Sequence, residues 1–135
     1  MLEITVDAQI RNIPVVTSFV DEQLEQLGTA IKQQMAIDVA IDEIFTNIAS
    51  YAYPGASGSA TIRFDFDPEE KSAVITMIDS GIPFDPLQKP DPDVTLSAEE
   101  RQIGGLGIFL VKKTMDQVLY RRENGKNILT IRKKI

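Results

Sequence analysis

The sequence predicts an α+β fold, a two-layer α/β sandwich in which helices cover one face of a mixed, mostly antiparallel sheet. Three observations predict it: short segments of alternating apolar and polar residues, longer segments with apolar residues at steps of three and four, and turn signals between neighbouring strands. With 135 residues, 43% of them hydrophobic, the chain can form one compact core, so a single domain is expected over residues 1–135.

The first part of the chain predicts a strand and two helices. Residues 2–7 alternate between apolar and polar side chains, which is the period of a half-buried strand. A helix follows between Asn12, which favours a helix start, and Gly28, which favours its end. A second helix is expected from about residue 34 to residue 51, because apolar residues form one core-facing stripe there. The stripe consists of Ile37, Ile41, Ile44, Ile48 and Tyr51.

The remainder of the chain predicts two hairpins. The Asp67-Pro68 turn joins the strands of the first, and Asn124-Gly125, a strong hairpin signal, joins those of the second. The four strands are expected at residues 61–66, 72–79, 118–122 and 128–132.

A long loop and a helix separate the two hairpins. Residues 80–103 contain four of the seven prolines and show no clear periodicity, which is unusual for a connection in a small domain. A mobile lid is therefore expected over about residues 85–103. Residues 105–115 then predict a helix.

Composition excludes several kinds of chemistry. The chain has no cysteine and no histidine, so disulfides, zinc-finger spacings and catalytic triads with histidine are absent. Any general base must be a carboxylate, and any metal must be a hard ion held by oxygen. The net charge of -6 argues against direct nucleic-acid binding. There is no run of about 20 apolar residues to span a membrane and no signal-peptide pattern, so a cytoplasmic protein is expected.

Glu43 and Asn47 are the first candidate site residues. They lie four residues apart on the second helix and therefore share one side of it, at the border of the apolar stripe. The Glu43 carboxylate could act as a catalytic base, and the Asn47 amide oxygen could ligate Mg²⁺. Alternatively, both are ordinary polar residues of a solvated helix flank.

Asp79 and Gly81 are the second candidates. Asp79 ends an apolar strand, where a half-buried carboxylate could accept a hydrogen bond from an exocyclic amine such as that of adenine. Gly81 would let a ring lie against the backbone. The alternative is a turn in which the Asp79 side chain satisfies local backbone amides.

A glycine-rich segment is the third candidate. Free backbone amides at the start of a helix favour phosphate, and Arg101, just upstream, could reach a terminal phosphate. The sequence is neither a P-loop nor a dinucleotide fingerprint. A hinge without a ligand, beside a surface arginine, is the alternative. The segment consists of Gly104, Gly105, Leu106 and Gly107.

The order of these three motifs resembles the nucleotide boxes of the GHKL ATPases, which include gyrase, chaperone, histidine-kinase and mismatch-repair proteins. Within that superfamily, the stretches at residues 79–85 and 104–111 resemble the bacterial anti-sigma factor serine/threonine kinases. The resemblance implies a Bergerat-type ATP-binding fold with ATP and Mg²⁺ as cofactors. It also implies Asp79 on adenine, Asn47 on Mg²⁺, Glu43 as base and the glycines at the phosphates.

The leading hypothesis is an ATP-dependent serine/threonine kinase that phosphorylates a small anti-sigma-antagonist protein of the STAS type, binds a sigma factor and switches between these partners. The alternative is a nucleotide-gated binding module without phosphoryl transfer. A histidine-kinase catalytic domain would have to find its substrate in another chain, because no helix bearing a phosphoacceptor histidine is present. A homodimer is compatible with the resemblance.

Two positions depart from the family pattern. Many relatives carry a histidine four residues after the metal-binding asparagine, where this chain has Tyr51. Many also have Gly-Thr in the last hairpin, where Asn127 closes the segment Gly125-Lys126-Asn127. The first departure leaves Glu43 without a helper, and the second leaves one adenine contact unassigned.

Overall fold

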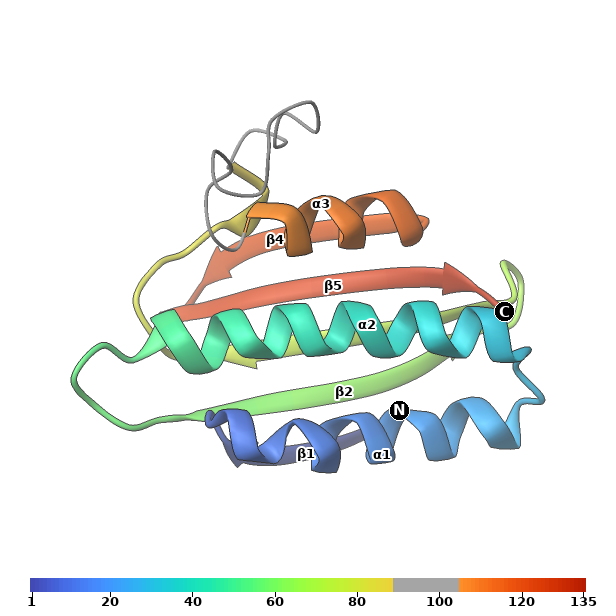
Figure 1. Cartoon of the computed structure of the whole chain (residues 1–135), viewed down its shortest axis with the longest axis horizontal. Helices are drawn as coiled ribbons and strands as arrows, with labels where there is room; N and C mark the ends of the chain where they lie inside the picture. Colours follow the sequence, from blue (N-terminus) through green and yellow to red (C-terminus); the bar gives the residue numbers. More distant parts are fainter. Residues whose placement is uncertain (89–104) are drawn as a thin grey trace.

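The computed structural model describes residues 1–88 and 105–135 (Figure 1). Most of the expected lid, about 85–103, lies outside the described residues. No helix in the described part is long and apolar enough to cross a membrane. The main elements are β1 (Leu2–Asp7), α1 (Ile13–Gln26), α2 (Ile31–Asn47), β2 (Ser59–Asp67), β3 (Ser72–Asp79), α3 (Gly105–Thr114), β4 (Gln117–Glu123) and β5 (Lys126–Lys134).

The five strands form one sheet in the order β1-β2-β3-β5-β4. Each neighbouring pair is antiparallel, so the described sheet is wholly rather than mostly antiparallel. Both predicted hairpins are present, and Asn124 and Gly125 turn the second one with φ values of 54° and 75°. These positive values explain the Asn-Gly pair, because both central residues of this turn need them.

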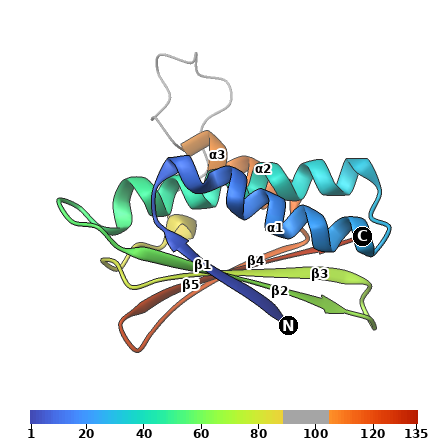
Figure 2. The ribbon, with the colours of Figure 1, turned by 90° about the horizontal axis from the view of Figure 1, so that it is seen from below.

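All three long helices cover the same face of the sheet, so the α+β two-layer sandwich is confirmed (Figure 2). The core lies between the layers because strand residues alternate, and one set of side chains faces the helices. On β3 this inward set is Ala73, Ile75, Met77 and Asp79, all buried. Phe45 of α2 is the largest of the fully buried side chains in the described part of the chain. Burial of such a side chain stabilises the fold by about 1.5–3 kcal/mol.

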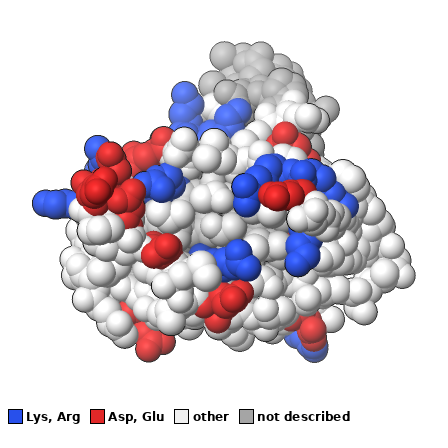
Figure 3. Space-filling view, turned by 180° about the vertical axis from the view of Figure 1, so that it is seen from behind, with Lys and Arg blue, Asp and Glu red and all other residues white. Residues whose placement is uncertain are grey.

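The other face of the sheet is open to solvent and carries charges of both signs (Figure 3). An ion pair joins Arg132 Nη2 of β5 to Asp67 Oδ2 of β2 over 2.6 Å. The Arg132 guanidinium, with backbone amides of the following turn, lowers the pKa of Asp67 below its ordinary value.

The predicted core-facing stripe of α2 is correct up to Ile48, but the inclusion of Tyr51 was wrong. The α-helix ends at Asn47 and continues as one turn of π-helix, Ile48–Ala52. A π turn holds more residues than an α turn, so the buried position shifts by one residue. Ala52 is therefore buried, whereas Tyr51 is 45% exposed.

Candidate functional site

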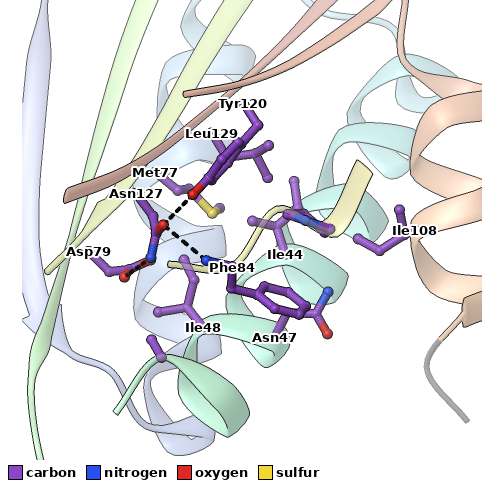
Figure 4. Close-up of a pocket in the computed structure, with 12 residues that line it drawn as sticks. Ile44, Asn47, Ile48, Met77, Asp79, Phe84, Ile108, Tyr120, Asn127 and Leu129 are labelled. Atoms are coloured by element: carbon purple, nitrogen blue, oxygen red, sulfur yellow. Dashed lines mark hydrogen bonds between the residues drawn. The ribbon is translucent and has the colours of Figure 1, made fainter. Parts of the chain in front are cut away.

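A pocket opens where the end of α2 meets β3, β5, β4 and α3 (Figure 4). Two of the predicted site residues, Asn47 and Asp79, line it. Apolar side chains provide most of the remaining wall: Ile44, Ile48, Ala52, Met77, Phe84, Pro86, Ile108 and Leu129. The pocket thus joins the first two motifs of the sequence in one largely apolar cleft, which is the usual character of a small-molecule site.

Asp79 is the polar end of the inward-facing series on β3, and it is only 5% exposed. Its Oδ1 accepts hydrogen bonds from the backbone N–H of Gly81 and from Asn127 Nδ2, both at 2.9 Å. Among the described residues, no donor reaches Oδ2. One oxygen of this buried carboxylate is therefore saturated, and the other is free to accept a hydrogen bond from a ligand.

Gly81 is buried beside the site but does not line the pocket. A Cβ at this position would overlap the backbone carbonyl of Ala52. The next residue, Ile82, donates its N–H to the same carbonyl at 2.9 Å. The structure therefore gives Gly81 a packing reason: only glycine lets residues 81 and 82 lie against Ala52 at the end of the π turn that follows α2.

Asn47 and Glu43 lie one turn apart on α2, about 6 Å along its axis. Asn47 faces the pocket, whereas Glu43 lies outside it, next to the start of α3. In the described part of the chain, neither side chain has a hydrogen-bond partner. Both therefore keep their polar atoms available for a ligand.

Only part of the glycine-rich motif can be placed. Gly104 and Arg101 lie outside the described residues, and α3 begins at Gly105, with Leu106 in its first turn. Gly107 is buried, and a Cβ there would overlap the Glu43 carboxylate. The third motif thus contacts the first, and its helix start provides backbone amides without intrahelical partners.

Asn127 and Tyr120 line the same pocket, and sequence reasoning did not assign them to the site. Asn127 is 5% exposed and lies directly opposite Asp79 in the pairing of β3 with β5. Tyr120 donates its hydroxyl hydrogen to Asn127 Oδ1. The signal that could have found Asn127 is the alternation with Leu129 and Ile131, which places residue 127 on the inward face.

The donor set fits a nucleotide with a hard cation. A free carboxylate oxygen suits an amino group, the unpartnered Asn47 amide suits a cation, and a helix start suits phosphate. Among residues 1–88 and 105–135, no group of three or more carboxylates could hold a metal on its own. A cation here would therefore depend on the ligand's phosphate oxygens, as Mg²⁺ in nucleotide sites commonly does.

Comparisons with known proteins agree with this reading of the fold. The sequence matches the histidine kinase-like ATPase domain family over residues 6–133. The serine/threonine-protein kinase BtrW of Bordetella bronchiseptica is 29% identical over 99 residues, 73% of this chain and 68% of BtrW. The serine-protein kinase RsbW of Bacillus cereus is 26% identical over 132 residues, 95% of this chain and 81% of RsbW.

A solved structure also resembles this chain. The histidine kinase domain of the blue-light activated histidine kinase from Erythrobacter litoralis EL346 matches with a TM-score of 0.53 at 15% identity. The match covers 77% of this chain but only 45% of the solved one, so it concerns the fold alone.

Proposed function

This chain belongs to the family of histidine kinase-like ATPase domains, and on that premise we propose that it binds ATP with Mg²⁺ in the pocket of Figure 4 and acts as a serine/threonine protein kinase. The observation that carries the proposal is Asp79, a buried carboxylate with one saturated and one free oxygen in an apolar cleft. The names of the relatives BtrW and RsbW, both protein kinases, support the choice of reaction.

The proposed roles run from Asp79 at the end of β3 to Asn47 and then Glu43 on α2. Asp79 Oδ2 accepts a hydrogen bond from the amino group of adenine at the far end of the pocket. Asn47 supplies an amide oxygen to the cation, and Glu43, one turn further, accepts the proton of the attacking hydroxyl. Bound ATP supplies the phosphoryl group, with its charge partly neutralised by Mg²⁺.

The glycine-rich segment has the phosphate role in this proposal. The backbone from Gly104 to Gly107, including Gly105 and Leu106, donates N–H groups to phosphate oxygens at the start of α3. Arg101 pairs with the terminal phosphate, and the segment of about residues 85–103 closes over the nucleotide. Gly81 shapes the base end of the site through its contact with Ala52.

The proposed acceptor is a serine or threonine of a small anti-sigma-antagonist protein of the STAS type. In this scheme the chain is a single cytoplasmic domain, residues 1–135, that can form a homodimer. The chain binds the sigma factor when it is not occupied by the antagonist. Phosphorylation of the antagonist then switches the chain from one partner to the other.

A second candidate function is a nucleotide-gated binding module of the same fold without phosphoryl transfer. The observation that favours it is Tyr51, which stands where many relatives have a histidine that assists the base. The Tyr51 ring pairs with Phe84, at a centroid distance of 5.8 Å, rather than with Glu43. Glu43 therefore has no side-chain helper among the described residues.

Calorimetric titration tests the binding half of the proposal. Wild-type protein is titrated with Mg-ATP and Mg-ADP, beside Asp79→Asn and the control Asp7→Asn, which alters an exposed carboxylate at the end of β1. Saturable binding that is lost in Asp79→Asn and kept in Asp7→Asn is expected. No binding to the folded wild type would refute the nucleotide site.

A transfer assay then separates the two candidate functions. The chain is incubated with ATP labelled at the γ-phosphate and with STAS-type proteins of the source organism. Label on one serine or threonine of such a protein, absent with Glu43→Gln, supports the kinase. Nucleotide binding that changes the affinity for the partner, with no label transferred, supports the binding module.

A further inference from the structure

Asn127 forms hydrogen bonds with three parts of the site: Asp79, Tyr120 and the backbone of residues 82–84. It lies on β5 directly opposite Asp79 of β3, with its side chain on the buried, helix-facing side of the sheet. Figure 4 shows the amide between the Asp79 carboxylate and the Tyr120 hydroxyl. A side chain in this position can control how Asp79 meets a ligand.

Two backbone contacts fix the orientation of the Asn127 amide. The N–H of Phe84 must meet an oxygen, and it donates to Oδ1 at 3.3 Å. The carbonyl of Ile82 must meet a donor, and it accepts from Nδ2 at 2.8 Å. The opposite flip would place two donors and two acceptors face to face, so only one orientation satisfies both backbone groups.

The remaining capacity of the amide is used by two side chains. Tyr120 donates its hydroxyl hydrogen to Oδ1, and Nδ2 donates its second hydrogen to Asp79 Oδ1 at 2.9 Å. An asparagine amide has two donor hydrogens and two acceptor lone pairs. All four are therefore occupied, and Asn127 has no hydrogen bond left to give to a ligand.

These hydrogen bonds determine how the Asp79 carboxylate is oriented. Its Oδ1 receives two N–H donors, from Gly81 and Asn127, which fixes the plane of the carboxylate and its acceptor character. Oδ2 is left as the acceptor for the pocket. Tyr120, whose hydrogen is directed to Asn127, also presents only acceptor lone pairs to the pocket.

We propose that Asn127, held by Tyr120, is a positioning residue that orients Asp79 to recognise the exocyclic amino group of a purine nucleotide. The inference rests on the proposed nucleotide function and adds to it the residues that determine base recognition. Asn127 acts through Asp79 and does not touch the base. Without it, Asp79 remains in the pocket but loses the contact that fixes the orientation of its carboxylate.

The test compares two nucleotides that differ only in the amino group: ATP and purine riboside triphosphate, both with Mg²⁺. Dissociation constants are measured for wild type, Asn127→Ala and Tyr120→Phe. The control is Thr130→Val on the same strand, whose hydroxyl lies on the open face near Thr76. Thermal unfolding of each variant accompanies the titrations.

Wild type is expected to prefer ATP by about tenfold or more, the usual worth of a hydrogen bond to a charged group. Asn127→Ala should lose most of this preference by weakening ATP binding, while its affinity for purine riboside triphosphate stays unchanged. Tyr120→Phe, which removes one oxygen from a folded protein, should reduce the preference in the same direction. Thr130→Val should match the wild type.

A purely structural role of Asn127 would lower the affinity for both nucleotides by the same factor, and that result would overturn the inference. An unchanged preference for ATP over purine riboside triphosphate in Tyr120→Phe would also overturn the inference. This variant provides the test if Asn127→Ala fails to fold. A different result, no ATP binding by the wild type, would refute the proposed function itself.

Discussion

Gly107, in the first turns of α3, lies directly against the Glu43 carboxylate of α2, so that a Cβ at position 107 would overlap Glu43 Oε2. The two residues are far apart in the sequence, and the packing of α3 beside α2 brings them together. The atom that a new methyl group would meet is the far end of a flexible side chain. Glu43 can therefore move aside without displacing either helix.

This contact predicts a selective effect of Gly107→Ala. The substitution should change the free energy of unfolding by less than about 1 kcal/mol, because the side chain and not the backbone gives way. Phosphoryl transfer should fall by about tenfold or more, since a small displacement of a catalytic group is costly. Chemical denaturation and the transfer assay measure the two effects.

Leu110→Ala serves as the control for Gly107→Ala, because Leu110 lies on the exposed side of α3. It should leave transfer unchanged. A large loss of stability in Gly107→Ala would show that α3 cannot remain packed against α2. The loss of transfer could then not be assigned to a displaced Glu43 side chain.

Glu43→Gln tests the base directly. The amide has nearly the shape of the carboxylate but cannot accept the proton, so transfer should fall by roughly 10²- to 10⁴-fold. ATP affinity should stay within a few fold of the wild type, because Glu43 does not line the pocket. Single-turnover transfer and calorimetry on the same preparations provide the measurements.

The matched control for Glu43→Gln is Asp42→Asn, an exposed neighbour on α2 within 3.4 Å of the Thr46 hydroxyl. Its transfer rate should equal that of the wild type. Equal rates for Glu43→Gln and Asp42→Asn would remove Glu43 from the role of base.

Gly81→Ala should destabilise the protein even without nucleotide. A Cβ there would overlap the Ala52 carbonyl, and backbone atoms cannot move aside as a side chain does. We expect a loss of about 1–3 kcal/mol in the free energy of unfolding, the usual cost of overpacking. Urea denaturation of the ligand-free protein checks this, with the exposed neighbour Ser80→Ala as control. Unaltered stability would mean that Gly81 is needed for the close approach of a ligand ring to the backbone and not for packing against Ala52.

Much of this fold was predictable because its signals are local. Alternation, helical periodicity and the Asn124-Gly125 turn depend on neighbouring residues, and the structure has the elements they predict. The same holds for Asp79 and Asn47 in the pocket, since a strand end and a helix face can be read from spacing. The start of α2 was missed by three residues because Ile31 and Met35 are exposed and extend no core-facing stripe.

The features that escaped prediction depend on contacts between distant segments. β5 lies between β3 and β4, which no local pattern of the last hairpin indicates, and this pairing sets Asn127 opposite Asp79. The exposure of Tyr51 depends on a π turn for which the sequence contains no local signal. The packing reason for Gly81 likewise depends on Ala52, which lies on another element.

Asp38 on α2 faces two carboxylates of α1, Asp21 and Glu25. Burial, a hydrogen bond with Asp21 and the charges of Asp21 and Glu25 raise the pKa of Asp38 from 3.8 to about 8. The Oδ1 atoms of Asp38 and Asp21 are both buried without a donor among the described residues. A proton on Asp38 provides the hydrogen bond with Asp21, so the folded protein favours protonated Asp38.

This raised pKa predicts that stability falls as pH increases. The folded state binds more protons than the unfolded chain between about pH 4 and pH 8. The contribution is therefore fully present below about pH 4 and lost as pH rises through about 8. Asp67, whose pKa is lowered, acts in the opposite direction and only at more acidic pH.

Thermal unfolding from pH 5 to pH 9 isolates the contribution of Asp38. The Tm of the wild type should decrease across this range, whereas that of Asp38→Asn should decrease less. The amide introduced by this substitution can still donate a hydrogen bond to Asp21 but cannot ionise, so the variant should be the more stable protein at pH 9. Asp42→Asn, an exposed carboxylate on the same helix, should follow the wild type. Parallel curves for wild type and Asp38→Asn would show that Asp38 does not hold a proton between α1 and α2.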